Sequence, residues 1–187
     1  MINNIYFSDS FFKNAIDTFE KASDCMVSYN DNVIDFDKVK MAYCEKYGSS
    51  KEASQSVDVL VHNKNNNIVF IEFKNGKLKG KYKTSRLKSK LRDSILIFNE
   101  INCLDLSFTR KKMEYILVYN YEKNKNSVEE QQKSPNEGLR TIQQTLAKKA
   151  RQEFVYFGLE LLKNVFVLDV HTYTKEEFDK YYNTQLK

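Results

Sequence analysis

The sequence predicts a single α/β or α+β domain in which a mixed β-sheet is flanked by helices. Three observations point to this class. The 187 residues suit one domain, and 41% of them are hydrophobic, which is enough to build a core. Apolar residues alternate in some segments and recur every three to four residues in others, and the two kinds of segment follow one another along the chain. One Pro and five Gly argue against a repeat array or a long linker.

Helical spacing predicts helices over residues 9–22, 35–47 and 86–101, and two more that begin after Ser134 and Thr174. Asp35, Ser134 and Thr174 are suited to cap the helices that follow them. In the third helix we expect Leu87, Leu91, Ile95 and Phe98 to be buried, with Lys88, Lys90 and Arg92 outside. The helix after Ser134 should carry its apolar residues inward as far as Leu161.

Alternating or β-branched residues predict strands over 57–62, 68–74, 112–121 and 165–170, and the hydrophilic stretch 122–133 is expected to be a loop. We therefore divide the single domain, 1–187, into three parts. Residues 1–34 form an N-terminal helical elaboration, 35–121 form the core, and 134–187 form a C-terminal helix, strand and helix.

The strands over 57–62 and 68–74 are joined by a short polar loop, which predicts an antiparallel hairpin. With the turn at Asn65, paired residue numbers sum to 130, so Asp58 lies opposite Glu72 on the same face. At roughly 5 Å and an effective dielectric constant of about 20, two such carboxylates repel each other by about 3 kcal/mol. Either one of them is protonated or a cation lies between them.

Lys74 lies two residues beyond Glu72 on the same face, roughly 6.5–7 Å along the strand. Ser56-Val57-Asp58 followed by Ile71-Glu72-Phe73-Lys74 and a helix resembles the PD-(D/E)XK nuclease superfamily, which has a restriction-endonuclease-like fold. The resemblance covers residues 35–121. Val57 stands where a Pro is expected, and the upstream Glu of many members corresponds to either Glu45 or Glu20.

This resemblance implies metal-dependent hydrolysis of phosphodiester bonds. Asp58, Glu72 and Lys74 would be catalytic, and Mg²⁺ or Mn²⁺ would be held by Asp58, Glu72 and the backbone carbonyl of Phe73, with Glu45 as a candidate further ligand. Lys74 would orient the attacking water and stabilise the charge that develops on the phosphate. Restriction, repair and defence against phage or plasmids are the roles that the resemblance suggests.

A basic stretch supports nucleic acid as the partner, with DNA expected ahead of RNA. Between Lys74 and Arg92 there are seven Lys, two Arg and no acid, although the net charge is only +5. The side chains expected to contact phosphates are those of Lys77, Lys79, Lys81, Lys83, Arg86, Lys88 and Arg92. A homodimer that cuts both strands is left open.

Two other functions use the same features. One is a catalytically inactive nuclease-like module that binds nucleic acid, and the other is a protein-interaction subunit of a larger complex. Widely spaced cysteines (Cys25, Cys44 and Cys103) and the absence of a signal or membrane-spanning pattern predict a cytoplasmic protein. The Lys- and Asn-rich composition without Trp suggests a bacterial source.

Overall fold

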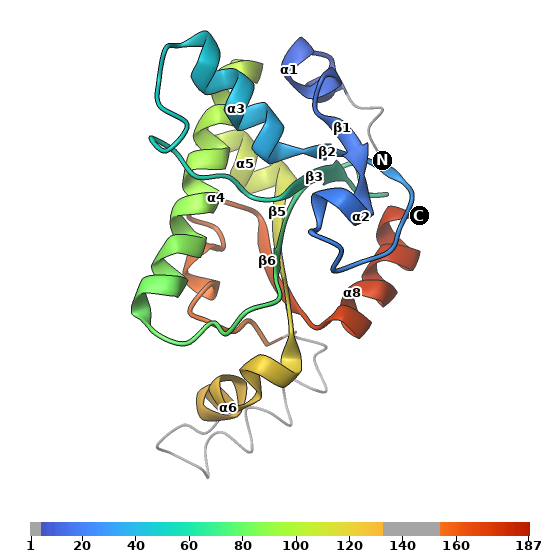
Figure 1. Cartoon of the computed structure of the whole chain (residues 1–187), viewed down its shortest axis with the longest axis vertical. Helices are drawn as coiled ribbons and strands as arrows, with labels where there is room; N and C mark the ends of the chain where they lie inside the picture. The colour runs from blue at the N-terminus through green and yellow to red at the C-terminus, as the bar shows by residue number, and fades with distance from the viewer. Residues whose placement is uncertain (1–4, 133–153) are drawn as a thin grey trace.

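The computed structural model describes residues 5–132 and 154–187 and contains a six-stranded mixed sheet with the order β1-β2-β3-β4-β5-β6 (Figure 1). The pairs β1–β2, β2–β3 and β3–β4 are antiparallel, and the pairs β4–β5 and β5–β6 are parallel. The strands are β1 (Ile16–Thr18), β2 (Asn32–Asp35), β3 (Val59–His62), β4 (Ile68–Lys74), β5 (Met113–Tyr119) and β6 (Asp169–Tyr173). The predicted mixed sheet flanked by helices is therefore confirmed.

Helices cover both faces of the sheet (Figure 1). One core lies between the sheet and α3 (Phe36–Lys46), α4 (Lys81–Asn102) and α5 (Leu106–Lys112). The other lies beneath α2 (Phe19–Ala22), α8 (Lys175–Tyr181) and the π-helical turn η3 (Tyr182–Leu186). The first core also receives buried side chains from η1 (Ile5–Phe7), α1 (Ser10–Lys13), α6 (Tyr121–Gln132) and η2 (Glu160–Leu162).

The β3–β4 hairpin has the alternation that its sequence predicts. Leu60 and Phe70 lie in the core beneath α3 and α4, whereas Val61 and Val69 lie in the core on the other face. The helices predicted over 35–47 and 86–101 are confirmed as α3 and α4, and Asp35 caps α3 by accepting a hydrogen bond from the backbone N–H of Lys38. A capping box formed by Thr174 and Glu177 opens α8, as expected.

The helix predicted over 9–22 is wrong, because this segment contains α1, β1 and α2. Phe12 and Phe19 are both buried, but they belong to the cores on opposite faces of the sheet, and Ile16 is exposed. Their spacing therefore does not mark one apolar helix face. Residues 16–18 pair with 32–34 instead, so the part expected to be a helical elaboration contributes two strands to the sheet.

Two predictions for the second half of the chain are also wrong, and the bounds of a third are shifted. The expected loop over 122–133 is largely helix α6, in which Asn124 and Val128 are buried four residues apart. Phe157 lies in a turn with positive φ rather than in a helix, and Leu161 is exposed in η2. A last strand is present as expected, but it is β6 over Asp169–Tyr173 rather than 165–170. The capped helix start at Ser134 lies outside the described residues.

Within residues 5–132 and 154–187, no helix has the length and apolar character needed to span a bilayer.

Phe98 tests the packing of α4 on the sheet. Its ring is fully buried, and its centroid lies 5.9–6.5 Å from those of Tyr6, Phe12, Phe70 and Phe108. Phe98→Ala should lower the free energy of unfolding by about 3–5 kcal/mol, measured by urea denaturation. Leu96→Ala on the same helix is the matched control and should cost less than about 1 kcal/mol, because Leu96 is 66% exposed. Equal losses would contradict this packing.

Candidate functional site

The hairpin places Asp58 and Glu72 together. Val59 pairs with Ile71 and His62 with Ile68, so paired numbers sum to 130 and the predicted register is confirmed. Asp58 directly precedes β3, where the same register continues to Glu72. The Oδ2 atom of Asp58 accepts a hydrogen bond from the backbone N–H of Phe73 at 2.7 Å. This contact fixes the Asp58 carboxylate against β4.

The segment before β3 is held by α4 and α3. The backbone N–H of Gln55 donates to Asp93 Oδ2 at 2.8 Å, and the backbone N–H of Val57 donates to Ser94 Oγ at 2.9 Å. The carbonyl of Asp58 accepts from the backbone N–H of Phe36 at 3.0 Å, at the start of α3. Asp58 is therefore held through its backbone as well as its side chain.

Lys90 of α4 bridges the two carboxylates. Its Nζ atom lies 2.7 Å from Glu72 Oε1 and 3.2 Å from Asp58 Oδ1. The prediction that Lys90 lies outside is wrong, since only 14% of its side chain is exposed. Position 90 is three residues after buried Leu87 and four before buried Ser94, so it shares their face of the helix. Of the two alternatives expected for the paired carboxylates, protonation or a cation between them, the structure contains a cation, the ammonium group of Lys90.

Lys74 is the second cation at the site, as predicted. Its Nζ atom lies 2.5 Å from Glu72 Oε1, and one third of its side chain is exposed. Two carboxylates therefore face two ammonium groups, and the formal charge of the four side chains is zero. Lys90 lies on the buried side of the site, and Lys74 lies on the side that faces solvent.

Glu72 is fully buried, and its Oε2 atom has no hydrogen-bond partner among the described residues. Burial, helped by the charge of Asp58, raises the pKa of Glu72 from its ordinary 4.5 to about 7, although Lys90 and Lys74 act in the opposite direction. Burial lowers the pKa of Lys90, but Glu72 and Asp58 together outweigh this effect and raise it. Glu72 is thus poised between its charged and neutral forms near neutral pH.

Tyr115 of β5 adds a further polar group to this buried environment. It is fully buried, and its hydroxyl has no hydrogen-bond partner among the described residues. Burial raises the pKa of Tyr115 well above its ordinary value, and the charges of Glu72 and Asp58 act in the same direction. Tyr115 is therefore a neutral hydroxyl, able to donate, in the core behind the acidic pair.

The upstream acid is not brought to this site. Glu45 is exposed on α3, and the described residues contain no group of three or more His, Cys, Asp or Glu side chains arranged to hold a metal. Asp58 and Glu72 are therefore the two acids to consider. The backbone carbonyl of Phe73 stays a predicted ligand.

The basic residues predicted to contact phosphates lie on the β4–α4 connection and on α4 itself. Lys77, Lys79, Lys83 and Arg86 are exposed. Lys83 Nζ donates to the carbonyl of Lys77 at 2.7 Å, so this pair is partly ordered. The remaining members of the predicted set are on α4: Lys81 as its first residue, then Lys88 and Arg92.

No protein-family model, curated protein or solved structure matches this chain.

The raised pKa of Glu72 predicts a pH-dependent stability. In metal-free protein with a chelator, Glu72 keeps a proton that the unfolded chain has lost above pH 4.5. Its stabilising contribution is present below pH 4.5 and disappears as pH rises through about 7, a loss of about 3 kcal/mol. Urea denaturation across this range should show a smaller decline for Glu72→Gln than for the wild type. Glu45→Gln, at an exposed acid, should follow the wild type, and parallel curves for Glu72→Gln would contradict the assignment.

Proposed function

We propose that this chain is a divalent-metal-dependent nuclease that hydrolyses the phosphodiester bonds of DNA or RNA, with Asp58, Glu72 and Lys74 as catalytic residues. The observation that carries the proposal is a position that both carboxylates contact and a cation fills. It lies beside the central strand β4, which carries the Glu-x-Lys part of the pattern, and Lys74 contacts Glu72 there.

The residues present fit a metal ion. The Lys90 ammonium marks a point that Asp58 and Glu72 oxygens both reach, at 3.2 and 2.7 Å. Glu72 also has a buried second oxygen with no partner among the described residues. Carboxylate oxygens are the donors that Mg²⁺ and Mn²⁺ prefer, and Mg²⁺ commonly binds through one or two carboxylates while it keeps several waters. Two acids are therefore sufficient for such a site.

When bound, the metal would act as a Lewis acid on the phosphate. The chain's own residues supply the remaining functions. Asp58, held by the Phe73 N–H, and Glu72, held in the sheet, provide a fixed pair of negative groups. Lys74 is partly exposed beside Glu72, where its ammonium group can contact a phosphate oxygen and stabilise the negative charge that develops during hydrolysis.

Lys90 has to give way in this proposal, because an ammonium group and a divalent ion cannot occupy the same point. The long side chain of Lys90 allows its nitrogen to move away from the carboxylates while its methylene groups stay close to the helix. The carboxylates gain a divalent charge in exchange for a monovalent one. We expect Lys90 to compete with metal, and its loss to strengthen metal binding.

The cations before and along α4 suit the nucleic-acid backbone. Lys77, Lys79, Lys83 and Arg86 follow directly after the strand that carries Glu72 and Lys74, and Lys88 and Arg92 lie one helical turn apart. Cations placed so close along the chain can contact successive phosphates without reading base sequence. DNA is the substrate we propose ahead of RNA.

One observation favours an alternative. Lys74 and Lys90 already neutralise both carboxylates, so the site is charge-balanced without any metal. In a module that binds nucleic acid without cutting it, this buried network would hold α4 on the sheet, and the basic residues would do the binding. The two functions differ in what a change at Lys74 does.

Cleavage of mixed DNA and RNA substrates with Mg²⁺ or Mn²⁺ tests the proposed function. Wild type should cut at least one substrate, and Lys74→Ala should reduce the rate at least 100-fold while binding survives. Lys111→Ala is the matched control, because Lys111 is an exposed lysine on α5 and belongs neither to the carboxylate site nor to the residues predicted to contact phosphates. If nothing is cut and calorimetry detects no metal binding, the nuclease hypothesis is wrong, and a module that binds nucleic acid without cutting it becomes the better hypothesis.

The competition between Lys90 and metal can be measured without any substrate. Lys90→Met keeps much of the side-chain volume and removes the charge, so Mn²⁺ should bind about tenfold more tightly by calorimetry. Lys88→Met, two positions away on α4, should leave the affinity unchanged. Weaker Mn²⁺ binding in Lys90→Met would show that Lys90 supports the metal site rather than competing for it.

A further inference from the structure

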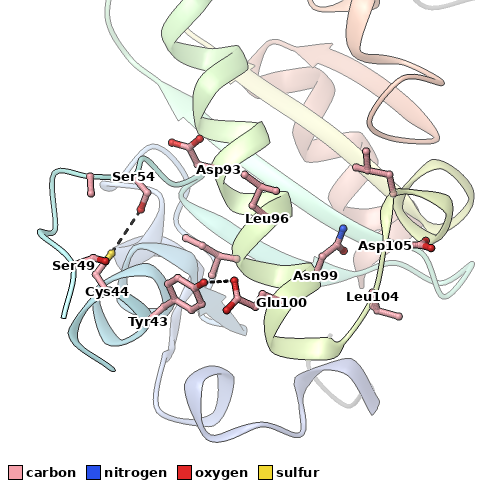
Figure 2. A pocket seen from close by; sticks show the side chains of 13 residues that line it. Tyr43, Cys44, Ser49, Ser54, Asp93, Leu96, Asn99, Glu100, Leu104 and Asp105 are labelled. Atoms are coloured by element: carbon pink, nitrogen blue, oxygen red, sulfur yellow. Dashed lines mark hydrogen bonds between the residues drawn. The ribbon is translucent and has the colours of Figure 1, made fainter. Parts of the chain in front are cut away.

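A cavity of about 700 Å³ lies on the part of α4 that follows Lys90 (Figure 2). Its walls come from α3, the segment 49–54, the second half of α4 and residues 104–106. Neither acid of the nuclease-like site lines it, and neither do Lys74 and Lys90. It is therefore a separate site, of a volume that is usual for small-molecule pockets.

Asn99 is the first sign that this cavity is built for a ligand. Only 8% of this residue is exposed, its side chain lines the cavity, and its Oδ1 atom has no hydrogen-bond partner among the described residues (Figure 2). A buried amide oxygen without a donor destabilises a fold. A ligand with an N–H group would supply the missing donor.

The charge of the lining is the second sign. Asp93, Glu100 and Asp105 line the cavity, and no Lys, Arg or His does. Each carboxylate accepts a hydrogen bond from the protein. Asp93 accepts from the Gln55 N–H and Asp105 from the Ser107 N–H. Glu100 accepts from the Tyr43 hydroxyl, as Figure 2 shows. The lining therefore carries three acidic side chains and no basic one, which disfavours anions and favours a cationic ligand.

The remaining walls are largely apolar. Ile97, Leu104 and Leu106 line the cavity, and Leu96 also faces it although 66% of its surface is exposed (Figure 2). An aliphatic chain without polar groups could not satisfy Asn99, and a compact inorganic cation would leave these apolar walls uncovered. The lining therefore calls for one molecule with an apolar body and a cationic, hydrogen-bond-donating end.

We propose that this cavity binds a small organic amine, with its ring or chain against Leu96, Ile97 and Leu104 and its ammonium group donating to Asn99 Oδ1 within the field of the carboxylates. This assignment stands independently of nuclease activity, because it uses none of the residues of that site. Asp93 lines the cavity and also accepts a hydrogen bond from the Gln55 N–H, in the segment that leads to Asp58 and β3. An occupant of the cavity would therefore lie beside a residue that holds this segment in place.

Tryptamine is the probe for this proposal, and indole-3-acetate is its matched control, with the same ring and a negative end. In ¹H–¹⁵N NMR titrations of the full chain, tryptamine should shift the amides of residues 93–100 saturably, and indole-3-acetate should not. Glu100→Gln keeps an acceptor for the Tyr43 hydroxyl but removes the charge, so it should weaken tryptamine binding at least fivefold. Glu45→Gln, an exposed acid outside the cavity on α3, should bind as the wild type does.

Asn99→Leu separates a ligand role from a structural one. It removes the unpartnered oxygen at similar volume, so the urea midpoint of the ligand-free protein should stay equal or rise while tryptamine binding weakens at least tenfold. The proposal is overturned if tryptamine causes no saturable shifts, if indole-3-acetate binds equally well, or if the midpoint falls and the affinity of Asn99→Leu matches that of the wild type.

Discussion

The burial of the Glu72 carboxylate beneath α4 is the constraint on which the rest of this structure depends. A charged group in the middle of a sheet is costly unless cations reach it, and here Lys74 approaches along the strand while Lys90 approaches from the helix. The second carboxylate, Asp58, increases the demand for positive charge at the same point. The position of α4 relative to the hairpin is therefore set by electrostatics as well as by apolar packing.

Helix α4 meets this constraint along its length. Leu87, Leu91 and Phe98 pack into the core. Between them along the helix, Lys90 contacts the Asp58 carboxylate and Ser94 accepts a hydrogen bond from the Val57 N–H. Farther along the helix, Asn99 turns toward a cavity with apolar walls and negative charge. One helix thus supports the proposed catalytic pair and forms a wall of the proposed amine site, and the segment 55–58 connects the two.

Alternation along two short strands was sufficient to predict the hairpin, its register and the meeting of Asp58 with Glu72, because a slip of one residue would move every apolar side chain to the wrong face. Lys90 was not predictable in the same way, since a lysine in a basic stretch normally lies in solvent. Its only signal was its position between Leu87 and Ser94 on the buried face. Strand β1 was missed because the spacing of Phe12 and Phe19 resembles one apolar helix face, although the two rings pack into cores on opposite faces of the sheet.

The mixed topology has a consequence for the order of folding. The β3–β4 hairpin closes through a short loop, so it can form within microseconds and brings Asp58 to Glu72 while both are still hydrated. The parallel pairing of β4 with β5 requires the long crossover through α4 and α5, which is a slower, non-local event. In the native structure the acidic pair is covered by α4, which also carries the Lys90 ammonium. We therefore expect the carboxylates to lose their water only in the later, non-local stage of folding, when this helix docks and its cation reaches them.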